Sequence, residues 1–555
     1  MQKEQLQSII KQQQLASNPA NSAWVFASAG SGKTRILIDR LLRLLLSGVL
    51  PNKILCLTFT KAAASEMQNR IQENLSRWVK LSDDDLKMQI SQLSGYQATN
   101  KDLQKARIIF FEIIDSDNKI KIMTIHSFCQ SILKIFPFEA GISPNFEILE
   151  ANSKKILIKK ASDIVFKKIS QNHLLKNDIT NLFQDHSITE VSEAIEDLIK
   201  NKEDLDILCE KFFDINNIIK QIYKNCDIST TENSADILAE FKKQIIENKA
   251  PILQNYLNDS EIGKDKTIVK AINEFIKDSS LVNFHNYQSA FFNEKNISRK
   301  PSKNITKNEI LQKIFDEQCN LIESFLDKIN SLKICQNSST ILQLTNEILG
   351  KYNQLKQKDA LLDYEDLIII TNKILQNENF ASWIKMKMDS SYDHILVDES
   401  QDTNIKQWQI IKSLSEDFFS GIGASAKSRS LFVVGDEKQS IYSFQGAESD
   451  ISNKIYNYYN NQSNHLKKIN LNNSFRSSIN VLKAVDDIFQ NPQYGLAISK
   501  TNEYQSHNPI KNIKGNVEIW PQINNPEIEK NNKEFSWKSP SFEGSKELDA
   551  KEKLA

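Results

Sequence analysis

The sequence predicts an α/β protein with a parallel sheet that carries helices on both faces and is interrupted by a large all-helical segment. Three observations predict it. A glycine-containing motif lies between an apolar run and a helical pattern near the amino end. Short apolar runs alternate with helical patterns up to about residue 150 and again after residue 360, which is typical of a parallel sheet. Between these parts, apolar residues recur at helical spacing.

Composition sets the broad class. A chain of 555 residues is too long to fold around a single hydrophobic core, so two or three domains are expected. The content of 40% hydrophobic and 25% charged residues is typical of a soluble globular protein. Lys plus Arg and Asp plus Glu both number 70, so contact with a nucleic acid would have to come from a local groove.

Cysteine and histidine usage gives no sign of a metal centre. The six cysteines form no C-x-x-C pair and the seven histidines are scattered, so we expect no zinc site and a reducing cytoplasm. No run approaches the roughly 20 apolar residues of a membrane span, so no membrane partner is expected.

The first motif, ASAGSGKT at residues 27–34, follows the apolar run at 24–26. A strand, a tight turn and a helix N-terminus form an anion site, because backbone N–H groups and the helix dipole converge there. Lys33 would reach the β- and γ-phosphate oxygens and Thr34 would ligate Mg²⁺. Ala27 stands where the usual pattern has glycine, and it adds only one methyl group. The predicted nucleotide site comprises Ala27, Ser28, Ala29, Gly30, Ser31, Gly32, Lys33 and Thr34. Taken alone, the octapeptide is also compatible with a chance turn before a helix.

The second motif is DESQDT, which follows the predicted strand 394–397. A phosphate loop requires a carboxylate at the end of a neighbouring strand, to hold Mg²⁺ and to position water. Asp398 would lie in the coordination sphere of the metal, and Glu399 would accept a proton from the attacking water. By itself this segment would be read as an acidic turn after a strand.

Two further segments complete the pattern. The predicted strand 431–434 runs into GDEKQSIYSFQGA, in which Gln439 is followed by Tyr442 and Phe444. Further on, LNNSFRSS places Phe475 beside Arg476. An arginine from a neighbouring domain can stabilise charge on a γ-phosphate during its transfer.

The remaining elements follow from apolar patterning. The segment 151–345 has few helix breakers and is predicted to be all-helical. Beyond Pro521 the composition becomes polar, which predicts a disordered tail. The predicted strands are 25–26, 54–58, 120–125, 394–397, 431–434, 469–471 and 516–520, and the predicted helices outside the insertion include those from Lys33, from Lys61 and over 479–489.

Together these motifs resemble the superfamily 1 DNA helicases of the UvrD, Rep and PcrA type, and most closely the AddA helicase subunits in their alphaproteobacterial form. The matching segments run in the order of that family from about residue 13 to residue 520. They are SAWVFASAGSGKT, ILCLTFTKAAASEM, MTIHSFC, FPFEAGISPNF, LLDYEDLI, ILVDESQDT, VVGDEKQSIYSFQGA and NSFRS.

The resemblance implies RecA-like motor domains and an ATP- and Mg²⁺-dependent 3′–5′ DNA helicase of double-strand break repair. Gln13 would read the adenine edge, and Arg35 and Phe475 would sandwich its ring. Gln439 would sense the γ-phosphate and Arg476 would be the first arginine finger.

The resemblance also implies a groove for single-stranded DNA. Aromatic rings stack on bases without sequence preference, and hydroxyl groups reach phosphates. The residues at matching positions are Thr58, Phe59, Thr60, His126, Tyr442 and Phe444. Phe59 and Phe444 are also compatible with core packing. The implied partners are single-stranded DNA or DNA ends and an AddB-like subunit.

Members of this family carry a later DNA-contact motif and a second arginine finger, and AddA ends in a nuclease domain; we find none of these after Arg476. We therefore expect a C-terminally truncated chain, which leaves two functions open: a portion of a helicase, or a non-motor remnant that binds ATP, single-stranded DNA or a partner chain. A small-molecule kinase would leave DESQDT unexplained. The expected domains are 1–150 and 346–465 for the first motor domain, 151–345 for the insertion, 466–520 for the start of a second motor domain and 521–555 for a tail.

Overall fold

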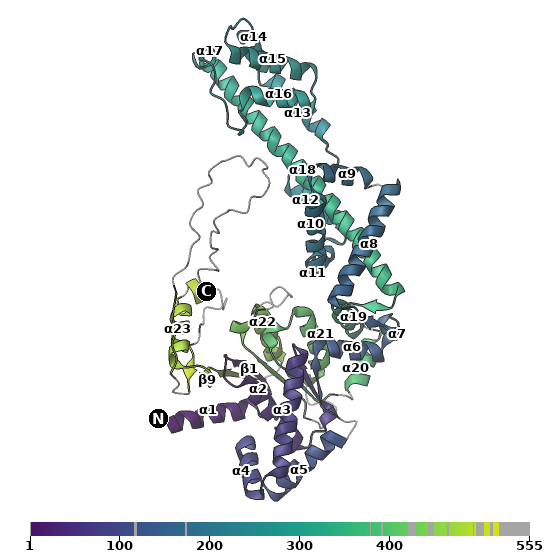
Figure 1. The fold of residues 1–555 in the computed structure, drawn as a ribbon, viewed down its shortest axis with the longest axis vertical. Helices are drawn as coiled ribbons and strands as arrows, with labels where there is room; N and C mark the ends of the chain where they lie inside the picture. Colours follow the sequence, from purple (N-terminus) through teal and green to yellow (C-terminus); the bar gives the residue numbers. More distant parts are fainter. Residues whose placement is uncertain are drawn as a thin grey trace, which may run out of the picture. The chain divides into compact units, whose positions relative to one another are not determined.

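The computed structural model describes residues 2–115, 119–172, 175–377, 379–389, 392–419, 428–441, 449–462, 466–491, 493–495, 504, 506–510 and 514–520. The chain divides into two compact units (Figure 1). We refer to residues 1–145 and 364–555 as the sheet unit, and to residues 146–363 as the helical unit.

The sheet unit is built on six parallel strands in the order β3-β2-β6-β7-β1-β8. The strands are β1 (Ser22–Ala27), β2 (Ile54–Thr58), β3 (Lys121–Thr124), β6 (His394–Val397), β7 (Ser430–Gly435) and β8 (Leu466–Leu471). Parallel strands buried on both faces are near-continuous apolar runs, and β2 and β7 are buried at every position. The predicted α/β fold with a parallel sheet is confirmed.

The helices of the sheet unit begin and end at residues with suitable caps. The Thr60 hydroxyl accepts a hydrogen bond from the backbone N–H of Ala63 and so caps the start of α3 (Lys61–Lys80). Gly48 ends α2 (Lys33–Ser47) in a left-handed conformation. The helices are α1 (Gln2–Ala16), α2 (Lys33–Ser47), α3 (Lys61–Lys80), α4 (Asp83–Ser94), α5 (Asn100–Asp115), α6 (Ile125–Ile135), α7 (Pro137–Ala140), α19 (Tyr364–Gln376), α20 (Ala381–Asp389), α21 (Ile405–Ser415), α22 (Ser449–Gln462) and α23 (Ile479–Phe489), with short 3₁₀ turns at Pro51–Lys53, Ser400–Asp402, Glu416–Phe418 and Glu437–Gln439.

Helices cover both faces of the sheet. Successive side chains of a strand point to opposite faces. Val25 of β1 belongs to a core formed with α2, α3, α4 and α5. The adjacent Trp24 instead stacks on Trp408 of α21, with 5.4 Å between ring centroids. The sheet is therefore the middle of three layers.

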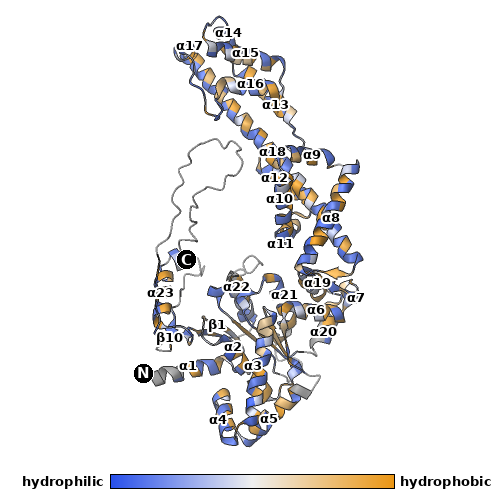
Figure 2. Cartoon of the chain, viewed as in Figure 1, coloured by the Kyte–Doolittle hydropathy of each residue, from blue (hydrophilic) through white to orange (hydrophobic). Residues whose placement is uncertain are grey.

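The helical unit is organised around one 50-residue helix, α18 (Glu309–Lys358). Its residues 311–332 pack in one hydrophobic core with α13 to α17, and its residues 344–355 pack in a second core with α8 to α12. These helices carry both hydrophobic and hydrophilic residues along their length (Figure 2). The other elements are α8 (Ala151–Asn172), α9 (Lys176–Asp185), α10 (Ile188–Lys200), α11 (Lys202–Phe212), α12 (Ile215–Asn225), α13 (Ser234–Glu247), α14 (Ala250–Leu257), α15 (Gly263–Lys277), α16 (Leu281–Phe291), α17 (Lys303–Thr306) and the two-residue strands β4 (Glu147–Ile148) and β5 (Leu361–Leu362).

Three features differ from the expectations. The helical unit extends from 146 to 363 rather than from 151 to 345, because α18 continues unbroken past residue 345 and β4 pairs with β5. The segment expected to start a second domain at 466 begins with β8, which pairs with β1 in the first sheet. Residues 516–520 form no strand, whereas β9 (Asn473–Ser474) and β10 (Asn508–Pro509) form a separate parallel pair.

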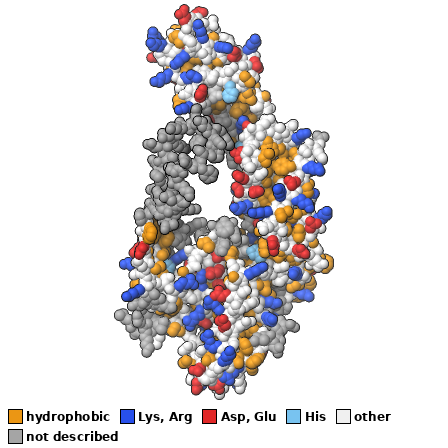
Figure 3. All heavy atoms as spheres, in the orientation of Figure 1, with side chains coloured by type: hydrophobic (Ala, Val, Ile, Leu, Met, Phe, Trp, Pro, Cys, Tyr) orange, Lys and Arg blue, Asp and Glu red, His pale blue; other side chains and the backbone are white. Residues whose placement is uncertain are grey.

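The predicted tail 521–555 lies outside the described residues. Among the described helices, none is both long and apolar enough to cross a membrane. Acidic and basic side chains are interspersed on the face drawn in Figure 3, which agrees with the zero formal net charge.

A buried arginine ties the amino-terminal turn to the sheet. Arg40 of α2 is fully buried, and its guanidinium donates to the carbonyl oxygens of Asn18 at 2.7 Å and Asn21 at 2.6 Å. It also donates to the hydroxyl of Ser430 in β7 at 3.0 Å. Burial lowers the pKa of Arg40 to about 9, with a smaller effect from Arg43. The hydrogen bonds offset part of the cost of burying the charge.

Replacing this arginine by an apolar side chain of similar length should destabilise the fold. Arg40→Met leaves the carbonyl groups of Asn18 and Asn21 without their donor, and each such loss costs about 1–3 kcal/mol. We expect the free energy of unfolding, measured by urea denaturation, to fall by about 3 kcal/mol. Arg77→Met, at an exposed position of α3, is the control and should change it by less than about 0.5 kcal/mol. Equal stability of the two variants would contradict this account.

Candidate functional site

The phosphate-loop motif connects β1 to α2 in the conformation that an anion site requires. Gly30 and Gly32 have φ angles of 74° and 92°, which side chains with a Cβ rarely adopt. Gly32 is the N-cap of α2, so the first N–H groups of a 15-residue helix follow it directly. Ala27 is 2% exposed and packs in the core, so its methyl group is accommodated there. Lys33 and Thr34 occupy the first turn of α2.

The structure brings the first two motifs together. The Lys33 ammonium lies 2.7 Å from the Glu399 carboxylate oxygen Oε2, although the two residues are 366 positions apart. Their side chains are 11% and 34% exposed. Glu399 adopts a left-handed conformation with a φ angle of 50° directly after β6. This contact forms because β1 and β6 are parallel strands of one sheet, separated by β7, and both run toward the same edge.

Asp398 is buried beside this ion pair. Its backbone N–H donates to the carbonyl of Leu57 at 2.9 Å, and its Oδ1 accepts the N–H of Glu399 at 3.1 Å. Burial and then the Glu399 carboxylate raise the pKa of Asp398 to about 7, and Lys33 opposes the shift. Carboxylate and hydroxyl oxygens, such as those of Asp398 and Thr34, are the ligands that Mg²⁺ prefers. Within the described residues there is no cluster of three His, Cys, Asp or Glu side chains able to hold a metal.

Gln401 connects the two acidic motifs. Its Nε2 donates to Glu399 Oε2 at 2.7 Å, and its Oε1 accepts the backbone N–H of Asp436 at 2.9 Å. Gln439 Nε2 in turn donates to Asp436 Oδ2 at 2.6 Å. A continuous chain of hydrogen bonds therefore links Glu399 with Gln439. Sequence analysis assigned no role to Gln401 or Asp436, although both lie inside the quoted motifs.

A glycine is required where β7 passes this network. A Cβ on Gly435 would lie 2.7 Å from Gln401 Oε1 and would clash with the Ser400 hydroxyl. The backbone of β7 therefore approaches DESQDT more closely than any side chain permits.

The NSFRS segment lies against the phosphate loop. The backbone N–H of Phe475 donates to the carbonyl of Gly30 at 2.9 Å. A Cβ on Gly30 would lie 2.7 Å from Cβ of Arg476. Both predicted residues are therefore adjacent to the loop. Phe475 is half-buried and Arg476 is exposed.

Two of the three residues predicted at the adenine, Gln13 and Arg35, also lie together. Gln13 of α1 is 8% exposed, and its Nε2 is 3.7 Å from the position of a Cβ on Gly32. Gln13 and Arg35 both line a cavity of about 840 Å³ between α1, α2, α3 and α4.

The described residues predicted to contact DNA lie at or just after the carboxyl ends of β2 and β3, at the same edge of the sheet. Thr58 is 1% exposed and its hydroxyl donates to the carbonyl of Thr60 at 3.0 Å, so it shapes the loop. Thr60 is exposed and caps α3, and Phe59 is half-buried. His126 packs edge-on against Tyr364 at 5.5 Å between ring centroids, and burial lowers its pKa. Tyr442 and Phe444 lie outside the described residues.

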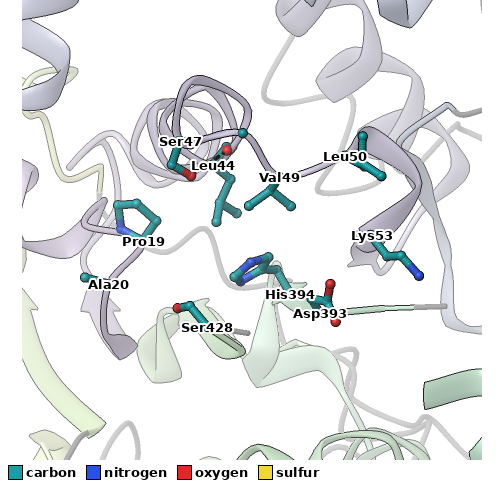
Figure 4. Close-up of a pocket in the computed structure, with 11 residues that line it drawn as sticks. Pro19, Ala20, Leu44, Ser47, Val49, Leu50, Lys53, Asp393, His394 and Ser428 are labelled. Carbon is teal, nitrogen blue, oxygen red and sulfur yellow. Dashed lines mark hydrogen bonds between the residues drawn. The ribbon is translucent and has the colours of Figure 1, made fainter. Parts of the chain in front are cut away.

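A different cavity, of about 540 Å³, lies at the opposite ends of the strands (Figure 4). It is lined by residues such as Leu44, Val49 and His394, and by none of the predicted site residues. His394 Nδ1 is 2.8 Å from the Ser430 hydroxyl, which also accepts from Arg40. Burial and the Arg40 charge lower the pKa of His394 to about 4, so the ring is neutral near pH 7.

This histidine should make stability depend on pH. The pKa of the ring is near 6.5 in the unfolded chain and about 4 in the fold, so acidification protonates the unfolded state first. The contribution of the neutral His394 ring to the free energy of unfolding is complete above pH 6.5. It is lost as the pH falls toward 4, which lowers the free energy of unfolding by about 3 kcal/mol. In His394→Asn, the drop in unfolding free energy between pH 7 and pH 4, measured with urea, should be smaller than in the wild type by about this amount.

Ser47→Ala changes a non-titrating residue of the same cavity and is the control, which should keep the wild-type pH dependence. Parallel pH curves for wild type and His394→Asn would contradict the assignment.

A glycine loop between a strand and a helix, with carboxylates at the end of a parallel strand of the same sheet, defines a P-loop nucleotide-binding domain of the RecA-like type. Residues 10–262 and 183–460 match the family described as UvrD/REP helicase N-terminal domain. The chain belongs to the UvrD/REP helicase family.

Curated relatives are consistent with this membership. The chain is 25% identical over 528 residues to the A subunit of the ATP-dependent helicase/nuclease of Lactobacillus acidophilus, covering 86% of this chain and 40% of the relative. The proteins of the same name from Lactobacillus johnsonii and Listeria monocytogenes are 28% and 26% identical, over 86% and 84% of this chain and 39% and 38% of their own length. The chain thus spans about two fifths of the length of these relatives.

Proposed function

We propose that this chain is the ATP-binding, amino-terminal portion of a DNA helicase of the UvrD and AddA type, which unwinds DNA with 3′–5′ polarity during double-strand break repair. The observation that carries the proposal is the 2.7 Å contact between Lys33 and Glu399, because it joins the phosphate loop to the acidic motif. The names of the relatives, which include ATP-dependent helicase, support the same activity.

Each residue of the site has a chemical task in this proposal. The N–H groups after Gly32 and the Lys33 ammonium bind the β- and γ-phosphates of ATP. Thr34 and Asp398 hold Mg²⁺, which neutralises charge on the phosphate oxygens when bound. Glu399 accepts a proton from the attacking water. A triphosphate in the loop competes with Glu399 for the Lys33 ammonium, and this competition leaves the carboxylate available as a base.

The hydrogen-bonded chain through Gln401 couples this base to the γ-phosphate sensor. Gln439 binds Asp436, and Asp436 binds Gln401, which binds Glu399. A movement of Gln439 toward a γ-phosphate therefore alters the contacts of the carboxylate that activates water. Phe475 stacks on the base opposite Arg35, and Arg476 stabilises charge on the γ-phosphate in the transition state.

Nucleotide binding tests this site directly. Lys33→Ala removes the ammonium and should abolish Mg²⁺-ATP binding, measured by isothermal titration calorimetry. Glu399→Gln is the matched variant, because it breaks the same ion pair but keeps the ammonium. It should retain binding and lose at least about 100-fold in ATP hydrolysis. Equal nucleotide affinity of wild type and Lys33→Ala would refute the site assignment.

The same proposal assigns a DNA surface and a partner. Phe59, Thr60 and His126 lie at the edge of the sheet reached by β2 and β3, and we assign them to a single-stranded DNA groove together with Tyr442 and Phe444. The relatives are named as one subunit of a helicase/nuclease, which supports an AddB-like partner chain. Residues after β8 are assigned to the start of a second RecA-like domain.

A second candidate function is a non-motor protein that binds ATP, single-stranded DNA or a partner chain. Translocation requires two bodies that close and open around ATP, and the described residues contain one six-stranded sheet.

A strand-displacement assay tests the second candidate function. The purified chain should bind Mg²⁺-ATP and a 3′-tailed duplex without separating its strands, because only one complete motor domain is present among the described residues. Fluorescence of a labelled strand reports unwinding, and a full-length relative serves as the positive control. ATP-dependent unwinding by this chain alone would eliminate the second candidate.

A further inference from the structure

The base end of the proposed nucleotide site opens into a polar cavity of about 840 Å³. Its walls come from α1, α2, α3 and α4, and charged side chains contribute to its lining. Its lining includes Gln13, Arg35, Asp39 and Glu73.

Gln13 contributes its amide side chain to the lining of this cavity. The residue as a whole is more than nine-tenths buried. Its position beside Gly32 places this polar group at the junction between the phosphate loop and the cavity. An amide both donates and accepts hydrogen bonds, so it is complementary to a ligand with donors and acceptors on a flat edge, such as a nucleobase.

Arg35 lies one turn before Asp39 on the same face of α2. Its Nε is 3.8 Å from Asp39 Oδ2, and the side chains are 72% and 26% exposed. Burial raises the pKa of Asp39 to about 6, while Arg35 and then Arg43 oppose the shift. Arg43 donates to the Gln14 carbonyl at 2.6 Å and to the Ser17 hydroxyl at 2.9 Å. Because Arg43 donates to these groups, Asp39 is available as the acidic partner of Arg35 on α2.

The contact between Arg35 and Asp39 would favour ligand binding if Arg35 stacks on the ring of a nucleobase. An exposed arginine loses rotamer freedom when it is held in one position. A carboxylate that already restrains the guanidinium lowers this cost before the ligand arrives. The planar guanidinium stacks well on an aromatic face.

We propose that Asp39 is a positioning residue that holds the Arg35 guanidinium over the nucleobase, so that the site prefers a nucleoside triphosphate to inorganic triphosphate. The inference rests on the nucleotide site proposed above. The phosphate loop binds both ligands, whereas Gln13, Arg35 and Asp39 act only on the one that carries a base.

The test compares binding of Mg²⁺-ATP and of Mg²⁺-tripolyphosphate by calorimetry. Asp39→Asn should weaken ATP binding about fivefold and leave tripolyphosphate binding unchanged. In the Arg35→Ala background, Asp39→Asn should have no further effect, because a positioning residue acts through its partner. Glu73→Gln, which removes a carboxylate from the same cavity, is the control and should bind both ligands as the wild type does.

The outcomes are distinct. An equal loss for both ligands, or a loss that persists without Arg35, would overturn the positioning role. Wild-type affinity of Asp39→Asn for ATP would overturn it too, and would leave the nucleotide site intact. If the wild type binds neither ligand, the nucleotide site itself fails. If Asp39→Asn does not fold, as judged by circular dichroism, the exposed Arg35→Ala must by itself give the ATP-selective loss.

Discussion

The ion pair between Lys33 and Glu399 is the contact on which the arrangement of this site depends. It requires two strands that are far apart in sequence to run in the same direction and to end at the same edge of one sheet. The core on each face of the sheet fixes that register: Val25 packs with α2 to α5 on one side, and Trp24 packs on Trp408 on the other. Core packing therefore sets the geometry of the charged groups.

The same edge collects the remaining site residues. Asp398 directly follows β6, Asp436 directly follows β7, and Phe475 comes after β8 and the short strand β9. In a parallel sheet these positions meet outside the carboxyl ends of the strands, where ligands of open α/β sheets bind. Gly435 and Gly30 lack a Cβ where two of these segments approach most closely. The hydrogen bonds of Gln401 then join the segments into one polar network.

Sequence analysis predicted the parallel sheet because its strands are continuous apolar runs. The bounds 54–58 and 394–397 agree with the structure, and the helix 479–489 does as well. The assignment of 466–471 to a second domain differs from the structure, in which β8 pairs with β1. Lys467 and Lys468 give β8 the pattern of an edge strand, and this pattern does not indicate which strand lies beside it. Helix α1 was missed because its glutamine-rich sequence has little apolar periodicity. The role of Gln401 depends on a contact with Asp436, and no local pattern reveals a contact between distant segments.

The helix α18 has a mechanical consequence for the helical unit. At 1.5 Å per residue its 50 residues form a rod about 75 Å long. Its two ends pack in separate hydrophobic cores. A tilt of about 5° where one core holds the rod carries its far end through roughly 6 Å. A small local tilt at one core would thus be amplified along the length of this helix.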